Sequence, residues 1–97
     1  MPTYVTLANW TDQAIKTLKE GPNRRERARR AVEEAGGRVI GSYVTQGRYD
    51  VVLITEFPSE EKATATLLAM GMAGNLRTET LRAFTAEEMD RVYKAMP

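Results

Sequence analysis

The segment GSYVTQGRYDVVLIT, residues 41–55, contains two runs rich in β-branched and aromatic residues, separated by a short polar joint at Gly47. Such runs are typical of β-strands, and glycine suits a tight turn because it adopts a positive φ without steric cost. The segment therefore predicts a β-hairpin with strands over 38–45 and 49–57 and a two- to three-residue turn at 46–48. We expect the remaining chain to form a helix-bearing crossover on each side of this hairpin.

The chain before the hairpin predicts one strand and one broken helix. Residues 3–8 alternate in polarity, which is typical of a strand with Val5 and Leu7 on one face. Thr11 suits an N-cap because its hydroxyl can accept from a free amide of the first helical turn. Pro22 tolerates the start of a helix but not its interior, so we expect a break there and a second segment from about Pro22 to Ala35.

The chain after the hairpin predicts a helix over 59–72, a strand over 76–84 and a short terminal helix. Thr85 and Glu88 have the spacing of a capping box, which starts the terminal helix that runs to about Ala95. The second half of the 59–72 helix is apolar nearly all round, which favours contact with another subunit. A methionine-rich ligand groove is the alternative interpretation of the same pattern.

This order of elements, β-α-β-β-α-β with an added helix, is typical of an α+β ferredoxin-like domain. We expect a single domain over residues 1–97 with a four-stranded antiparallel sheet, a broken first helix and both main helices on one face. If Val5, Leu7, Val52 and Ile54 face the helices, the open face carries a mixture of aromatic, aliphatic and threonine side chains. These are Tyr4, Thr6, Tyr43, Thr45, Tyr49, Val51, Leu53, Thr55, Thr78, Thr80 and Arg82.

Such a face is too apolar to remain in water comfortably, and two copies packed face to face would cover it. The sequence therefore predicts a dimeric α/β barrel, or a higher homo-oligomer, that encloses a small lined cavity. The partner we expect is a second copy of the chain, together with a small apolar or aromatic ligand.

Composition narrows the classes of function. The 97 residues include no cysteine and no histidine, which removes thiolate ligands, disulfides and the commonest general base near neutral pH. We therefore expect no metal site, no cofactor and no catalytic residue that the sequence alone identifies. A net charge of +1 lacks the basic excess typical of nucleic-acid binders. No apolar run reaches about 18 residues and no leader-like segment opens the chain, so we expect a cytoplasmic protein without a membrane partner.

Three stretches resemble the GYD domain family. They are the opening Tyr4-Val5-Thr6-Leu7 with Trp10-Thr11-Asp12-Gln13, the joint Gly47-Arg48-Tyr49-Asp50, and the run from Gly74 to Phe84. The resemblance implies a small bacterial or archaeal protein of ferredoxin-like fold, related to the dimeric α/β barrels and without an assigned activity. It implies ligand-binding roles at the patterned positions, to which the open face adds Tyr4 and Tyr43. These positions are Trp10, Tyr49, Asp50, Asn75, Arg77, Thr80 and Arg82.

Three functions remain open at this point. The first is a homo-oligomeric module for small-molecule binding or assembly. The second is a cofactor-independent isomerase or monooxygenase, with Asp50 or Glu79 as the base and Tyr49, Asn75 or Arg82 orienting the substrate. The third is a module that binds nucleotide or nucleic acid, which the short turn and the charge balance disfavour. Asp50 also has a structural interpretation as an acceptor for turn amides, and Trp10 one as a packing anchor.

Overall fold

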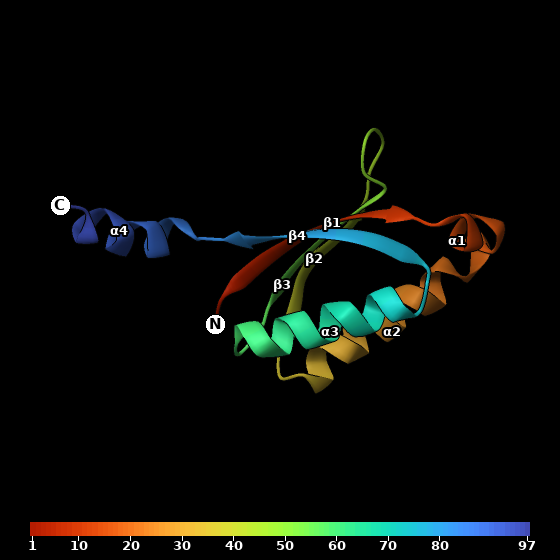
Figure 1. Ribbon diagram of the computed structural model, residues 1–97, viewed down its shortest axis with the longest axis horizontal. Coiled ribbons are helices and arrows are strands. Elements are labelled where there is room, and N and C mark those ends of the chain that lie inside the picture. The colour runs from red at the N-terminus through yellow and green to blue at the C-terminus, as the bar shows by residue number, and fades with distance from the viewer.

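The computed structural model describes all 97 residues and shows a four-stranded antiparallel sheet in the order β2-β3-β1-β4 (Figure 1). This is the ferredoxin-like α+β fold that the sequence predicts. None of its helices combines the length and apolar character needed to cross a membrane. The elements are β1 Thr3–Trp10, α1 Asp12–Lys16, the 3-10 turn η1 Leu18–Glu20, α2 Gly21–Glu34, β2 Arg38–Val44, β3 Val51–Glu56, α3 Glu60–Met72, β4 Leu76–Ala83 and α4 Ala86–Ala95.

The first crossover contains the predicted break. Thr11 caps α1 by accepting a hydrogen bond from the Ala14 amide at 3.2 Å, and α1 ends at Lys16. The η1 turn follows, and α2 begins at Gly21 with Pro22 in its first turn, where a missing amide hydrogen costs nothing. The other helix starts also follow the sequence, because Ser59 caps α3 and Thr85 forms the capping box of α4 with Glu88.

Helices α2 and α3 cover one face of the sheet and leave the other uncovered (Figure 1). The core between the layers consists of Tyr4 from β1, Val32 from α2, Ala63 from α3 and Phe57, which follows β3. Phe57 is 0 % exposed, and its ring meets the Tyr4 ring edge-on with the centroids 6.1 Å apart. The helices contribute mostly small side chains here, so the two aromatic rings fill the space between the layers.

The predicted assignment of the two sheet faces is wrong for β1, β3 and β4. Tyr4 lies in the core, and its register partners Thr55 and Arg82 therefore share the covered face. The same alternation puts Thr6 and Leu53 on that face. The uncovered face carries an aliphatic patch instead, which we call the open-face patch: Val5, Leu7, Val52, Ile54 and Leu81.

The reversal has a physical reason. Aliphatic alternation identifies a buried face without saying whether its own helices or another molecule buries it. In this chain the small residues of the helices pack against the aromatic rings of Tyr4 and Phe57, and the aliphatic residues of the strands lie on the uncovered face. Tyr43 does lie on the uncovered face as predicted, opposite Val52, because a bulge between Val39 and Gly41 shifts the alternation of β2.

The hairpin connection is longer than predicted and spans residues 45–50. Gly47 has the expected positive φ, at 105°. Thr45 and Asp50 still face each other at the base of the loop, where the Thr45 amide donates to the Asp50 carbonyl at 2.8 Å. The Asp50 amide also donates to the Ala8 carbonyl of β1 at 2.9 Å. The Asp50 carboxylate accepts from the Trp10 amide at 3.0 Å. The resulting loop projects on the side of the uncovered face (Figure 1).

Helix α4 lies apart from the other helices. Strand β4 pairs with β1 along its whole length, and α4 follows beyond the end of the sheet, so that the molecule measures 52 × 30 × 18 Å (Figure 1). An ion pair between Arg82 and Glu88, 3.2 Å long, joins the end of β4 to the first turn of α4. The side chains of Val92, Tyr93 and Met96 are exposed.

Candidate functional site

A groove of about 400 Å³ lies between α3 and the edge strand β4. This volume is within the range of small-molecule sites, and the mixture of apolar and hydroxyl side chains is typical of them. Its lining consists of Tyr4, Ala63, Thr64, Leu67, Leu68, Thr78, Thr80 and Arg82. The groove therefore brings together three of the predicted ligand-binding residues, Tyr4, Thr80 and Arg82, under the helices rather than on the uncovered face.

The Tyr4 hydroxyl is the most unusual group in this groove. Tyr4 is 7 % exposed, and its Oη atom is buried without a hydrogen-bond partner in the protein. Leaving a buried hydroxyl unpaired costs about 1 to 3 kcal/mol, so native proteins seldom keep one without a reason. Tyr4 is one of the lining residues, so the residue whose hydroxyl lacks a partner belongs to the groove wall, although its Oη atom is itself shielded from solvent.

Strand β4 supplies the polar wall of the groove. Thr80 shares a hydrogen bond of 3.1 Å with Thr6 on β1, whereas Thr78, two residues earlier, is exposed. The Arg82 guanidinium donates to the Thr3 carbonyl at 3.3 Å and lies 5.9 Å from the centroid of the Tyr4 ring. The N–H of Thr85 and then the Arg82 guanidinium hold the pKa of the Glu88 carboxyl below its usual range. The groove is thus polar along β4 and apolar along α3.

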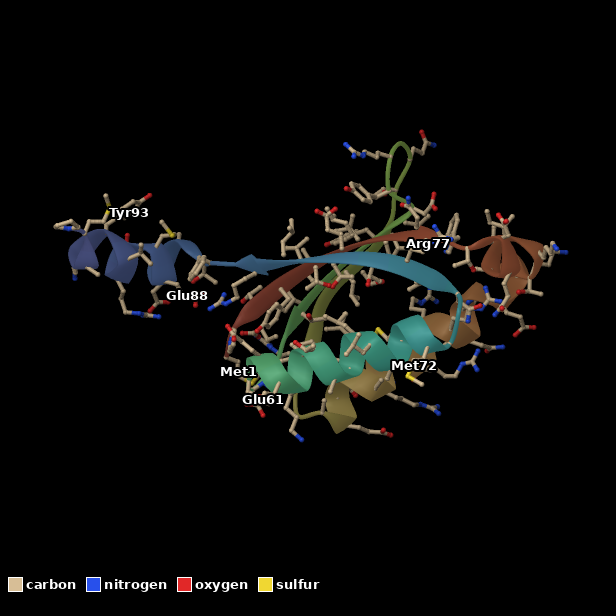
Figure 2. The ribbon with its side chains drawn as sticks, in the orientation of Figure 1. Met1, Glu61, Met72, Arg77, Glu88 and Tyr93 are labelled. Carbon is tan, nitrogen blue, oxygen red and sulfur yellow. The ribbon has the colours of Figure 1, made fainter.

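The remaining predicted residues lie elsewhere. Asp50 and Trp10 meet where the hairpin loop joins β1, and the Asp50 carboxylate is occupied by a backbone amide there. Asn75 accepts a hydrogen bond from Gln13 at 3.1 Å, near the start of β4. Arg77 is exposed on the uncovered face, opposite Asn9 of β1 (Figure 2). The predicted positions therefore form no single site.

Tyr49 and Glu79 form a polar contact over the uncovered face. The Tyr49 hydroxyl donates to Glu79 Oε2 at 2.8 Å, and because β1 lies between β3 and β4, the Tyr49 side chain reaches across β1. The hydrogen bond to Glu79 raises the pKa of Tyr49, and partial burial and the negative charge of Glu79 act in the same direction. The Arg48 guanidinium, 5.8 Å from the centroid of the Tyr49 ring, acts against this rise.

We expect Glu79→Gln to lower the pKa of Tyr49 toward the ordinary tyrosine value of about 10. A folded-state pKa above the unfolded value means that this contact stabilises the fold below the unfolded pKa. The contribution is lost as the pH rises through the folded pKa. Titration of the tyrosine ¹³Cζ resonances by NMR resolves Tyr49 from Tyr4, Tyr43 and Tyr93. An unchanged Tyr49 titration in Glu79→Gln would show that the contact is absent in solution.

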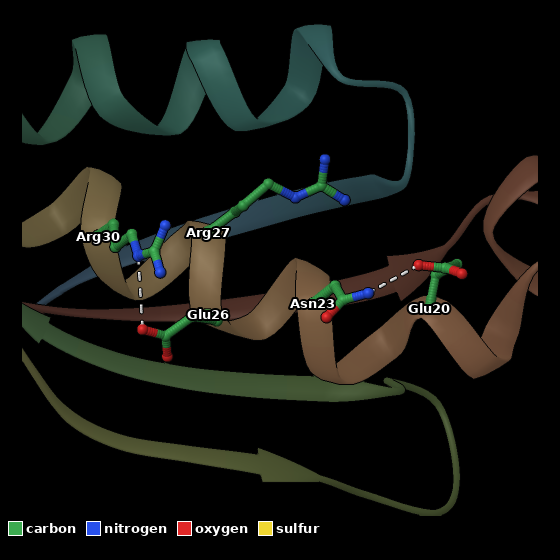
Figure 3. A pocket seen from close by; sticks show the side chains of 5 residues that line it. All are labelled: Glu20, Asn23, Glu26, Arg27 and Arg30. Carbon is green, nitrogen blue, oxygen red and sulfur yellow. Dashed lines mark hydrogen bonds and ion pairs between the residues drawn. The ribbon is translucent and has the colours of Figure 1, made fainter.

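A second hollow, of about 370 Å³, runs along α2 and is lined only by charged and amide side chains (Figure 3). Four of the five side chains pair with one another: Asn23 donates to Glu20 at 2.9 Å, and Arg30 approaches Glu26 at 3.5 Å. The hollow therefore has the character of a solvated helix face. No group of three acidic or other metal-ligating side chains comes together anywhere in the structure.

Sequence reasoning missed the apolar wall of the groove. Leu67 and Leu68 carry it, and the signal was present in the second half of α3, which is apolar on more than one side. That pattern by itself favours a subunit contact, with a ligand groove as its alternative. The structure shows that part of this apolar surface does line a groove.

Known proteins resemble this chain along most of its length. A protein of Thermus thermophilus described as "Glutamine synthetase and cystathionine beta-lyase binding protein" is 29 % identical over 90 residues, which is 92 % of this chain and 95 % of that protein. The crystal structure of TTHA0845, from the same organism, matches 89 % of this chain and 96 % of its own, with a TM-score of 0.56 and 25 % identity.

A structure of an MhuD mutant with two manganese protoporphyrin IX bound per active site matches 89 % of this chain and 95 % of its own. Its TM-score is 0.50 and its identity 15 %, so it shows a shared fold alone. The family profile of the GYD domain matches residues 4–93, which include the hairpin joint and the Gly74–Phe84 run. The chain therefore belongs to the GYD domain family.

Proposed function

We propose that the protein is a homo-oligomeric binding module that holds a small, mostly apolar or aromatic molecule in the groove between α3 and β4. The observation that carries this proposal is a concave site of ligand size lined by Tyr4, whose buried hydroxyl has no hydrogen-bond partner within the protein. The leucines of α3 suit an apolar ring or chain. The hydroxyl suits a hydrogen-bond acceptor on the same ligand, such as a carbonyl or carboxylate oxygen.

The open-face patch supports the homo-oligomeric part of the proposal. Val5 on the central strand β1 lies directly between Ile54 and Leu81, so the patch is continuous across three strands. Contiguous aliphatic patches on sheets are normally covered, and two sheets pack face to face at a spacing of about 10 Å. A second copy of the chain offers an identical patch, as a two-fold interface requires.

Two further observations favour binding over catalysis. The polar side chains that line the groove are threonines, a tyrosine and an arginine rather than carboxylates, and Asp50, which holds the Trp10 amide, is not among the lining residues. The relative from Thermus thermophilus is described as a protein that binds two enzymes, which supports a binding or assembly role for this chain as well.

Filling the groove tests the proposal. Leu68 and Met72 lie one turn apart on α3, 65 % and 88 % exposed, and only Leu68 lines the groove. We expect saturation-transfer NMR to detect binding of benzoate, phenylacetamide or indole to the unmodified protein. Leu68→Trp should weaken this binding by tenfold or more, because the indole ring occupies the groove, whereas Met72→Trp should leave it unchanged.

Tyr4→Phe separates the contribution of the hydroxyl to ligand binding from that of the apolar wall. It removes the unpaired hydroxyl without changing the ring, so we expect weaker binding of benzoate and phenylacetamide and unchanged binding of indole. The free protein should not lose stability, because the hydroxyl makes no hydrogen bond to give up. Absence of binding by all three probes, or equal binding to Leu68→Trp, would contradict the proposal. Native mass spectrometry of the purified protein reports the subunit number and any co-purified molecule.

A further inference from the structure

We infer that α4 is an exchanged arm: in the homo-oligomer proposed above, the apolar stripe of α4 packs on a second copy of the chain rather than on its own subunit. This inference rests on the homo-oligomer and adds to it a second contact surface. The stripe consists of Met89, Val92 and Tyr93 on the helix, spaced i, i+3 and i+4, together with Met96, the extended residue that follows its last turn.

The first argument is that α4 has an amphipathic pattern and that its own subunit leaves most of the apolar stripe exposed, with only Met89 half-buried. Val92, Tyr93 and Met96 are exposed, and α4 lies beyond the end of the sheet, away from α2 and α3 (Figure 1). An isolated helix of ten residues is marginal in water, and most helical stability in proteins comes from packing an apolar face. A helix of this length with a full capping box and an apolar stripe therefore needs a surface to cover it.

The second argument is direction. Figure 2 shows Tyr93 on the side of α4 that faces away from the helical layer, whereas Glu88 lies on the opposite side. The uncovered face of the sheet looks the same way as Tyr93. The apolar stripe thus continues the open-face patch past the end of the sheet, and a second copy lying on the patch comes within reach of the stripe.

The third argument is that contacts at its base hold α4 in this direction. Arg82 bonds to Glu88 Oε2 at 3.2 Å, and Glu88 also accepts from the Thr85 amide at 3.0 Å. The Arg82 guanidinium lies 4.4 Å from the centroid of the Phe84 ring at the same joint. Turning α4 back onto its own sheet would break the contact between Arg82 and Glu88, which is the one that joins β4 to the helix.

The fourth argument is area. Four strands at a spacing of about 4.8 Å and about six paired residues in length give the uncovered face roughly 400 Å² in projection. A helix of ten residues adds about 150 Å² at a rise of about 1.5 Å per residue. The helix thus adds more than a third to the projected area of the uncovered face, and a larger face favours the roughly 800 Å² of accessible surface per partner that a standard interface buries.

A photocross-linking experiment tests the exchange. The full chain carries a benzophenone amino acid in place of Tyr93 and is prepared in unlabelled and ¹⁵N-labelled forms, which are mixed in equal amounts and allowed to exchange subunits. If α4 packs on a second copy, irradiation gives cross-linked pairs in which one peptide is light and the other heavy. Cross-links confined to a single label would place α4 on its own subunit and overturn the inference.

Paired variants give the energetic readout. We expect Val92→Ser/Tyr93→Ser to raise the dissociation constant of the oligomer by tenfold or more in sedimentation equilibrium. Asp90→Ser/Arg91→Ser alters the polar side of the same helix and should leave the dissociation constant within about twofold. Equal dissociation constants for the two variants, with the oligomer intact, would overturn the exchanged arm alone. A monomeric unmodified protein in native mass spectrometry would instead overturn the proposed homo-oligomer, and the arm with it.

Discussion

Phe57→Ala is expected to lower the free energy of unfolding by about 3 to 5 kcal/mol. Phe57 is 0 % exposed and joins both layers, since it contacts the Tyr4 ring and lies in the core with Val32 and Ala63. These neighbours cannot collapse into the space of a lost ring, because the alanine has no atoms to extend and Tyr4 is held in the β1 ladder. For a domain of this size the total is about 5 to 15 kcal/mol, so much of the stability would be lost.

Urea denaturation followed by circular dichroism measures this effect, at one fixed protein concentration because subunit association also stabilises the fold. Phe84→Ala is the matched control. Phe84 is 52 % exposed at the joint before α4, and its removal leaves no enclosed cavity. We expect a loss of less than about 1 kcal/mol there. Similar losses in the two variants would show that the core is not centred on Phe57.

Val5→Lys is expected to convert the oligomer into monomers while the fold is retained. The Val5 side chain lies between Ile54 and Leu81 on the uncovered face, with no acidic residue directly opposite on either strand. Packing two sheets together would bury an unpaired ammonium group from each copy, at a cost of at least about 3 kcal/mol. Each 1.4 kcal/mol is a tenfold change, so we expect the dissociation constant to rise more than about a hundredfold.

Size-exclusion chromatography with light scattering measures the mass, and circular dichroism confirms the fold. In the monomer the lysine reaches water directly, so its effect on the folded subunit should be small. Met72→Lys introduces the same charge on α3, where Met72 points away from the uncovered face, and it should leave the oligomer intact. An oligomer that tolerates Val5→Lys would mean that the open-face patch is not the contact surface.

The elements of the fold are predictable from the sequence because their signals are local. Thr11, Ser59 and Thr85 each cap the helix that their position indicates, and Pro22 marks the break in the first crossover. The order of strands follows from the right-handed crossovers around the hairpin. The hairpin connection is longer than predicted, and the bonds from Asp50 to Ala8 and Trp10 of β1 are distant in sequence, so no local pattern indicates them.

The faces of the sheet and the site were harder to predict for a different reason. Alternation along β1 separates Tyr4 and Thr6 from Val5 and Leu7, but it does not say which set meets the helices. Which set meets the helices depends on the space between the sheet and the two helices. Because α2 and α3 contribute small residues there, an aromatic ring from the sheet is needed to fill that space. Because Tyr4 lies on the covered face, the candidate site lies there too, and Leu67 and Leu68 form its apolar wall. The resemblance to the family placed Asp50, Asn75 and Arg77 in one predicted site with Arg82, but in the structure these residues lie in different places.

Arg82 links the ligand groove to the contact surface of α4. Its guanidinium lines the groove beside Tyr4 and also holds Glu88 at the root of α4. An anionic ligand in the groove that attracts the Arg82 guanidinium must weaken the ion pair between Arg82 and Glu88. Conversely, when α4 is packed on a second copy and keeps that ion pair, the guanidinium is less available to the ligand. By thermodynamic reciprocity the two effects are equal in free energy. Binding of an anionic ligand in the groove is therefore expected to weaken the association of the subunits, and association of the subunits to weaken the binding of that ligand.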